Sequence, residues 1–318
     1  MFGLNNKKKI LLIGMPDLVL YCIHALKQAN KKIVGVITSP PDNPTYEYME
    51  KFLKNNRLFH IPNNKNFKDE TLLRTVRELE PDVGFVCSYN YLLPRELYEI
   101  PKFGTLNFHP SLLPDYRGAN PYFHAINNGE TETGITMHFL DDGFDTGDIV
   151  EQIKVPIYDN DTMGSLFSRQ NELTGKLCVE TVTKLEKGET LPRRKQPQTD
   201  NYKKAPKIHP DTDDVKIDWT KSVKEIDRFI RALNPFFGAT SFVNGVAIIF
   251  WDTEIIKSPA AASLPAGTVT DITSEEIYIS ANDGFIKTKI LSIGEYTYFS
   301  KTGRIVEVTN LKKGDRFN

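Results

Sequence analysis

Along the first half of the chain, short apolar runs alternate with segments whose apolar residues recur every three or four positions. The runs 9–14 (KILLIG) and 32–38 (KIVGVIT) have the length and the β-branched content of buried strands. Between them, the segment 16–30 places its apolar residues at helical spacing. Further helices are expected over 45–55 and 68–80, and a further strand over 82–87. This alternation predicts a parallel sheet covered by helices.

The pattern changes near residue 190, which predicts a second domain. Strands are expected over 104–109, 133–140 and 148–155, followed by a helix over 162–186. Residues 191–211 are rich in Pro, Gln, Lys and Asp without periodicity, and are expected to be a linker. In 212–318, Ser222 and Glu225 predict a capping box at the start of an amphipathic helix. The short strands after it, among them FVNGVAIIFW with an Asn244-Gly245 turn and FIKTKILSI, indicate a small, mostly β domain.

Composition and charge restrict the class of protein. The 318 residues are 40% hydrophobic and 25% charged, as in ordinary globular proteins. Lys plus Arg (40) and Asp plus Glu (41) balance to a net charge of −1, so no overall basic field attracts nucleic acid. The net charge does not exclude a local basic patch.

Cysteine usage and the N-terminal segment predict a cytoplasmic location. Cys22, Cys87 and Cys178 form no CxxC pair and are expected in the core of a protein from a reducing compartment. No apolar run is long enough for a leader or a membrane span, so no membrane contact is expected. The turn LIGMPD lacks the GxGxxG spacing of a dinucleotide site.

Candidate chemistry lies at the end of the strand GTLNFHP. Asn107 and His109 are two positions apart and share a face, and Pro110 ends the strand. The carboxyl ends of such strands form ligand crevices. A carboxamide and an imidazole suit acyl transfer to an amine, and Asp145 in the loop LDDGFDTGD would hold the imidazole. A buried histidine with a structural partner gives the same spacing, so both interpretations stay open at this point.

Longer motifs carry a resemblance to a known family. The runs NFHPSLLPDYRGANP and NGETETGITMHFLDDGFDTGDIV closely resemble formyltransferases that use 10-formyltetrahydrofolate. KIDWTKSVKEIDRFIRALNPFFGA and the final GDRF resemble the carboxy-terminal barrel domain shared by methionyl-tRNA formyltransferases and some sugar-amine formyltransferases. The resemblance implies an α/β fold: a Rossmann-like formyltransferase domain with a mostly parallel sheet at 1–190, a linker at 191–211 and a small, mostly β, barrel-like domain at 212–318.

The same resemblance implies roles for individual residues. Asn107 stabilises the oxyanion, His109 moves protons, and Asp145 tunes and orients His109. Residues matching the segments that contact the folate are Tyr91, Leu92, Leu93, Ser111, Leu112, Leu113, Pro114, Asp141, Asp142, Gly143 and Phe144. The leucines are equally suited to core packing.

No metal is implied, and the remaining polar candidates have plain explanations. The other histidines form no HxxxH motif or Cys/His cluster and are expected to be packing or surface residues: His24, His60, His124, His138 and His209. Arg117 is expected either to contact substrate or to tie its own loop together.

The acceptor amine depends on the loop after the second strand. Methionyl-tRNA formyltransferases carry a long, basic, glycine-rich insertion there, whereas TSPPDNPTYEYMEKF is short and acidic. This favours a small-molecule amine, namely a nucleotide-linked amino sugar of the kind used in lipopolysaccharide. The alternative is initiator Met-tRNA. The basic runs 193–195 and 203–204 support it, because positive charge favours binding to RNA phosphates.

Other members of the fold fit less well. Formyl-folate hydrolases carry an amino-terminal regulatory domain, and glycinamide ribonucleotide formyltransferases lack the carboxy-terminal unit. A folate binder without turnover would not need the proton-handling histidine. The sequence indicates no particular oligomeric state.

Overall fold

A computed structural model describes residues 7–63, 65–197, 199, 201–293, 296–300 and 302–318. The chain divides into two compact units. Unit 1 comprises residues up to Gly118, Glu132–Pro156 and Ser168–Lys204, and unit 2 comprises Ala119–Thr131, Ile157–Phe167 and Ala205–Asn318. The boundaries expected for independently folding domains, at 190 and 211, stay a prediction.

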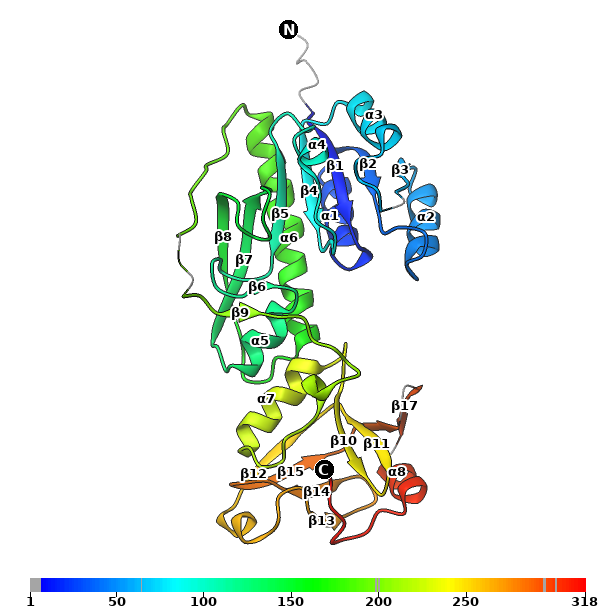
Figure 1. The fold of residues 1–318 in the computed structure, drawn as a ribbon, viewed down its shortest axis with the longest axis vertical. Helices are drawn as coiled ribbons and strands as arrows, with labels where there is room; N and C mark the ends of the chain where they lie inside the picture. Colours follow the sequence, from blue (N-terminus) through cyan, green and yellow to red (C-terminus); the bar gives the residue numbers. More distant parts are fainter. Residues whose placement is uncertain (1–6, 64, 198, 200, 294–295, 301) are drawn as a thin grey trace. The chain divides into compact units, whose positions relative to one another are not determined.

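A mixed sheet forms the centre of unit 1, in the order β3-β2-β1-β4-β5-β7-β8 (Figure 1). Neighbouring strands from β3 to β5 pair in parallel, whereas β7 is antiparallel to both β5 and β8. The strands are β1 (Lys9–Gly14), β2 (Lys32–Ile37), β3 (His60–Ile61), β4 (Val83–Cys87), β5 (Thr105–His109), β7 (Glu132–Phe139) and β8 (Ile149–Pro156). A two-stranded ladder joins β6 (Arg117–Gly118) to β9 (Lys204–Ala205). The expected mostly parallel α/β sheet is confirmed.

Helices cover both faces of this sheet. The helices are α1 (Pro16–Gln28), α2 (Tyr46–Asn55), α3 (Glu70–Leu79), α4 (Arg95–Tyr98) and α6 (Met163–Glu186), the last of which begins within unit 2. Helices α1 and α6 approach closely because Gly175 of α6 faces the backbone of Tyr21 in α1. Asp69 caps α3 by accepting hydrogen bonds from the backbone N–H groups of Thr71 and Leu72.

The interior of unit 1 is apolar and holds the three cysteines as expected. Leu11, Ile13 and Val86 belong to one buried cluster with residues of α3. Cys22, Cys87 and Cys178 are buried free thiols, and the Sγ atoms of Cys22 and Cys87 lie 3.6 Å apart.

Unit 2 combines helices with two antiparallel sheets. Its helical elements are α5 (Pro121–Asn127), η1 (Asp213–Val215), α7 (Val223–Leu233), η2 (Pro259–Ser263) and α8 (Thr302–Thr309). One sheet has the order β10 (Ala239–Val243), β11 (Val246–Phe250), β16 (Leu291–Ile293) and β17 (Tyr296–Ser300). The other has the order β12 (Glu254–Lys257), β15 (Gly284–Thr288), β14 (Ile277–Ser280) and β13 (Val269–Ile272). The predicted capping box at Ser222 and Glu225 is confirmed.

One expected strand of unit 2 is divided. The run FIKTKILSI forms β15 and β16, which belong to different sheets. Between them the Asp252 carboxylate accepts hydrogen bonds from the backbone N–H groups of Lys289 and Ile290 at 3.0 and 2.6 Å. This long-range cap satisfies the amides that a continuous strand would have paired.

Across the described part of the chain, no helix has the length and apolar character needed to cross a membrane.

Candidate active site

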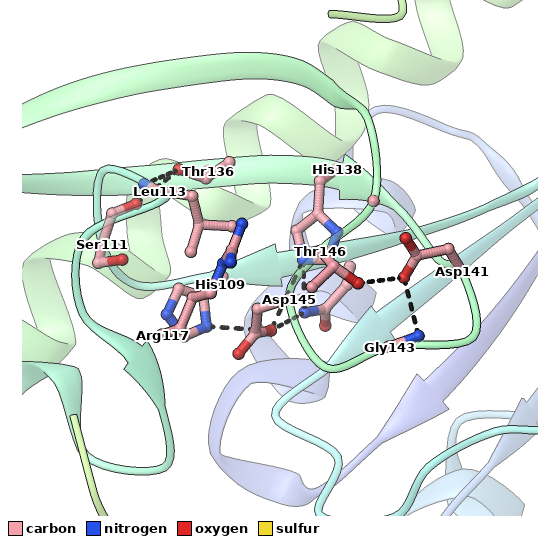
Figure 2. A network of polar contacts seen from close by, with 12 residues as sticks. His109, Ser111, Leu113, Arg117, Thr136, His138, Asp141, Gly143, Asp145 and Thr146 are labelled. Atoms are coloured by element: carbon pink, nitrogen blue, oxygen red, sulfur yellow. Dashed lines mark hydrogen bonds and ion pairs between the residues drawn. The ribbon is translucent and has the colours of Figure 1, made fainter. Parts of the chain in front are cut away.

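The candidate site is built on the carboxyl end of β5. Asn107 and His109 lie on that strand, and the antiparallel register with β7 places Asn107 opposite His138. The loop between β7 and β8 brings Asp145 to the same end (Figure 2). The three residues expected to act together therefore lie together, although they come from segments almost forty residues apart.

His109 is held between two acceptors. Its Nδ1 lies 3.3 Å from Oδ1 of Asp145, and its Nε2 donates to the backbone carbonyl of Tyr116 at 2.8 Å. The ring is buried. Because both nitrogens face oxygen acceptors, the doubly protonated imidazolium satisfies both contacts. The ring is thereby fixed in one orientation with a charge partner beside it.

Asp145 is the centre of the polar network in Figure 2. Its Oδ1 is 3.7 Å from Nε2 of His138 and accepts a hydrogen bond from Nδ2 of Asn107 at 3.4 Å. Burial opposes ionisation of the carboxyl, but the charge and hydrogen bond of His109 outweigh it. The pKa of Asp145 is therefore well below its usual range. The carboxylate stays charged at any physiological pH.

His138 is buried, as expected for a packing residue, and it also belongs to this network, which was not expected. Its Nδ1 donates to the carbonyl of Phe139 at 2.8 Å, which leaves Nε2 as an acceptor for Nδ2 of Asn107 at 3.1 Å. His138 thereby orients the amide of Asn107. In the sequence, His138 is marked only by its place on the strand that pairs with β5. The pairing register of β5 and β7 must be known before it can be placed opposite Asn107.

The loop 141–146 is held by its own aspartates. Asp141 accepts hydrogen bonds from the backbone of Gly143 at 3.1 Å and from Thr146 Oγ1 at 2.7 Å. Asp142 pairs with Arg95 and accepts a hydrogen bond from Tyr98 at 2.8 Å. Both carboxylates expected near the folate are therefore engaged in shaping the loop, and their contact with folate stays a prediction.

The loop 111–114 is likewise tied to the protein. Thr136 Oγ1 donates to the carbonyl of Ser111 at 2.6 Å and accepts from the backbone N–H of Leu113 at 3.1 Å. Leu113 is buried, and Leu112 packs against Gly134 of β7. Pro114 is half-buried. These contacts give the leucines a packing role whatever else they touch.

The segment 91–93 presents one apolar side chain to solvent. Leu92 is 50% exposed, whereas Leu93 is buried and the Tyr91 ring lies 5.4 Å from that of Tyr89. Phe144 is 69% exposed. Both residues lie on loops at the carboxyl ends of β4 and β7. Exposed apolar side chains beside a polar network fit a flat, partly apolar ligand.

Arg117 ties its own loop to the segment after residue 190. Its guanidinium donates to Oε1 of Gln196 and lies 5.0 Å from the centre of the Tyr202 ring. Arg117 was expected to tie its loop to its own backbone or to contact substrate; it contacts a distant segment instead, and contact with substrate stays a prediction. Gln196 was not anticipated, because the segment around it has no periodicity. Among the described residues, no group of three His, Cys, Asp or Glu side chains is arranged to hold a metal ion.

Comparisons with known proteins agree with this geometry. The formyl transferase family model matches residues 8–182, and the model of the formyl transferase C-terminal domain matches 210–298. A methionyl-tRNA formyltransferase from Bacteroides fragilis is 32% identical over 297 residues, which cover 90% of each chain. Another, from Francisella philomiragia, is 35% identical and covers 98% of each chain.

The fold is also similar to solved structures. An N-formyltransferase from Helicobacter canadensis, solved with folinic acid and dTDP-3-aminofucose, superimposes with a TM-score of 0.66 at 21% identity. The match covers 89% of this chain and 98% of that one. The chain belongs to the formyl transferase family.

Proposed function

We propose that the protein transfers the formyl group of 10-formyltetrahydrofolate to a primary amine, with Asn107, His109 and Asp145 as its catalytic residues. The observation that carries this proposal is that the three side chains meet at the carboxyl end of β5. Asn107 Nδ2 and His109 Nδ1 both lie within 3.4 Å of the Asp145 carboxylate. They converge in a chain with both domains of the formyl transferase family.

Each side chain has a distinct task. When the amine attacks the formyl carbon, Nδ2 of Asn107 donates to the oxygen that becomes negative, giving up its long contact with Asp145. His109 donates a proton to the departing folate nitrogen and takes one from the attacking amine, so the ring ends in its starting protonation state. Asp145 keeps His109 oriented through its contact with Nδ1. No metal takes part.

The donor lies against the loops 91–93 and 141–144. Leu92 and Phe144 provide apolar walls for the pterin and its linked ring, and loop backbone groups bond its polar edges. The aspartates 141 and 142 act indirectly, by holding the loop in shape.

Initiator Met-tRNA is the acceptor that the relatives support best. Chains named methionyl-tRNA formyltransferase are 31–35% identical to this one over most of its length. They outweigh the nucleotide-linked sugar expected from the loop after β2. Exposed basic residues also lie next to the catalytic loops, on the segment containing Gln196: Arg193, Arg194, Lys195, Lys203 and Lys204. Positive charge there suits an acceptor that carries phosphates.

A nucleotide-linked amino sugar remains the second candidate because of the short connection between β2 and α2. Residues 38–45 fold back on themselves: Ser39 Oγ and Thr45 Oγ1 are 3.2 Å apart, and Asn43 accepts hydrogen bonds from the Thr45 backbone and side chain. This compact turn contains one acidic residue, Asp42, and no basic residue, so it offers no basic arm to a tRNA. A sugar acceptor with its own diphosphate would still meet the basic segment.

A turnover assay separates these acceptors. Release of tetrahydrofolate from 10-formyltetrahydrofolate is measured with initiator Met-tRNA, with uncharged tRNA, and with dTDP- and UDP-linked amino sugars. We expect turnover with Met-tRNA and none with uncharged tRNA. Turnover confined to an amino sugar would move the assignment to the second candidate, and turnover with no amine would overturn formyl transfer itself. His109→Ala should abolish turnover while tetrahydrofolate still binds.

A further inference from the structure

Asp145 is held in a backbone conformation that needs outside support. Its φ is +55°, in the left-handed region that residues with a Cβ adopt at an energetic cost. Two residues further on, Gly147 comes so close to Phe139 that a Cβ would lie 1.9 Å from that carbonyl oxygen. The turn 145–147 is therefore tight and must be stabilised by its neighbours.

Gln196 supplies that support from a distant part of the chain. Its Nε2 donates to the backbone carbonyls of Asp145 at 2.9 Å and of Gly147 at 2.8 Å, so both amide hydrogens are used on the same turn. Its Oε1 accepts from Arg117. The side chain is only 9% exposed. A buried amide with every contact satisfied is a geometrically specific link.

The segment that carries Gln196 is fixed on both sides of it. We call residues 193–197 and 201–204 the strap. Before Gln196, Arg194 exchanges two backbone hydrogen bonds with Ile149 at the start of β8. After it, the backbone of Lys203 donates to Asp115 at 2.9 Å and accepts from Tyr116. The strap thus passes from β8 to the loop that follows β5.

The strap thereby connects the two acceptors of His109. Asp145, on Nδ1, is held directly by Gln196, and Tyr116, on Nε2, is held through Lys203 and through its neighbour Arg117. We infer that Gln196 is a positioning residue that keeps these two acceptors in register, so that His109 has one orientation and one charge partner. This inference rests on the role proposed above for His109 and Asp145.

The test compares Gln196→Leu and Gln196→Glu with wild type. Leucine removes all three bonds, whereas glutamate keeps the link to Arg117 and loses both donors. We expect kcat to fall by about 10- to 100-fold in both variants, the range for a misplaced catalytic group, with the KM for 10-formyltetrahydrofolate unchanged within about threefold. Normal kcat in Gln196→Glu would show that the donors to the 145–147 turn do not matter.

A matched control is the same substitution at another buried glutamine. Gln170 on α6 is 1% exposed, and its amide finds no hydrogen-bond partner among the described residues. Gln170→Leu should keep kcat within about twofold and fold at least as stably, because an unpaired buried amide is costly. An equal loss of kcat in both Leu variants would mean that buried glutamines matter only for packing.

A double variant tests whether Gln196 acts through Asp145. In an Asp145→Asn background, where the charge partner of His109 is already lost, Gln196→Leu should cost less than about threefold. A further loss equal to that in wild type would place the effect of Gln196 elsewhere.

A spectroscopic measurement separates this inference from the proposed function. The imidazole nitrogen signals of His109, assigned by their absence in His109→Ala, should shift in Gln196→Leu and stay in place in Gln170→Leu. This readout needs no acceptor, so it holds even if no amine is turned over. Unchanged His109 signals in Gln196→Leu would overturn the inference.

Discussion

At the scale of single residues, the site depends on one partly buried carboxylate that lies beside two imidazoles. Asp145 Oδ1 lies 3.3 Å from His109 and 3.7 Å from His138, and the network depresses the pKa of the Asp145 carboxyl against the effect of burial. A charge in such surroundings is stable only while its partners stay in place. The contacts that hold His109 in the proposed active site therefore also couple that site to folding.

Asp145→Asn should lower kcat by about 100-fold or more, in the range of general acid–base catalysis, and change the pH dependence of stability. The carboxyl has a folded pKa below its unfolded value of about 3.9, so its ionised form favours the folded state above that pH. The stability advantage of wild type over Asp145→Asn should be full near pH 7 and shrink as the pH falls below about 4. Urea unfolding at several pH values measures it.

The control for this experiment is Asp159→Asn, at an exposed carboxyl of the same unfolded pKa. Its stability difference from wild type should be small at every pH. A constant difference for Asp145→Asn from pH 7 to pH 3 would contradict the role of the ionised carboxylate.

His138→Phe should lower kcat by about 10-fold while 10-formyltetrahydrofolate binding persists, because Nδ2 of Asn107 loses the acceptor that orients it. The ring volume is kept, so packing changes little. Steady-state kinetics check it, with His24→Phe on the exposed side of α1 as the matched substitution. Equal kinetics for both variants would remove His138 from the site.

At the scale of elements, a change of strand direction creates the site. Parallel pairing from β3 to β5 aligns the carboxyl ends of those strands, and the antiparallel β7 then sets His138 opposite Asn107. The loop from β7 to β8 starts beside the first residues of β5, because Phe139 lies opposite Leu106, and it folds back so that Asp145 lies 3.3 Å from His109.

Local capping should set the stability of α7 in unit 2. Ser222 Oγ accepts from the Glu225 backbone at 3.3 Å, and Glu225 Oε2 accepts from the Ser222 backbone at 3.0 Å. Ser222→Ala should lower the free energy of unfolding by about 1 kcal/mol, the usual cost of losing such a cap. Lys224→Ala, exposed on the same helical turn, should change it by less than about 0.5 kcal/mol. Denaturant unfolding that ranks the two variants the other way would contradict the capping role.

At the scale of the whole molecule, the positive charge is local. Residues 191–204 contain five basic residues and one acidic residue, whereas 205–318 contain fourteen basic and fifteen acidic residues. The strap presents its basic side chains next to the catalytic loops, because Gln196 and Arg194 fix its path. A phosphate-bearing acceptor would meet this charge close to the reacting amine.

If Met-tRNA is the acceptor, its KM should rise steeply with salt. Two neutralised phosphates give about a tenfold rise between 50 and 200 mM salt, whereas the KM of the donor should change far less. Replacing both Lys195 and Lys204 by Ala should flatten this dependence. Replacing Lys51 and Lys54, exposed on α2, should leave it unchanged. A salt-independent KM for Met-tRNA would argue against phosphate contacts by the strap.

The amino-acid sequence by itself determined the elements and the family. Strands such as KILLIG and the helix capped by Ser222 were predictable because burial periodicity and capping depend on residues close in the chain. The motif around Asn107 and His109 was recognisable because its residues are contiguous, and Asp145 followed from a second contiguous motif.

Tertiary structure alone decided how these parts form a site. His138 enters through the cross-strand register of β5 and β7, and Gln196 enters through contacts fifty residues away in an aperiodic segment. The divided run FIKTKILSI depends on a cap from Asp252 in the same way. Each outcome rests on hydrogen bonds between residues distant in sequence, and hydrophobic periodicity carries no information about such partners.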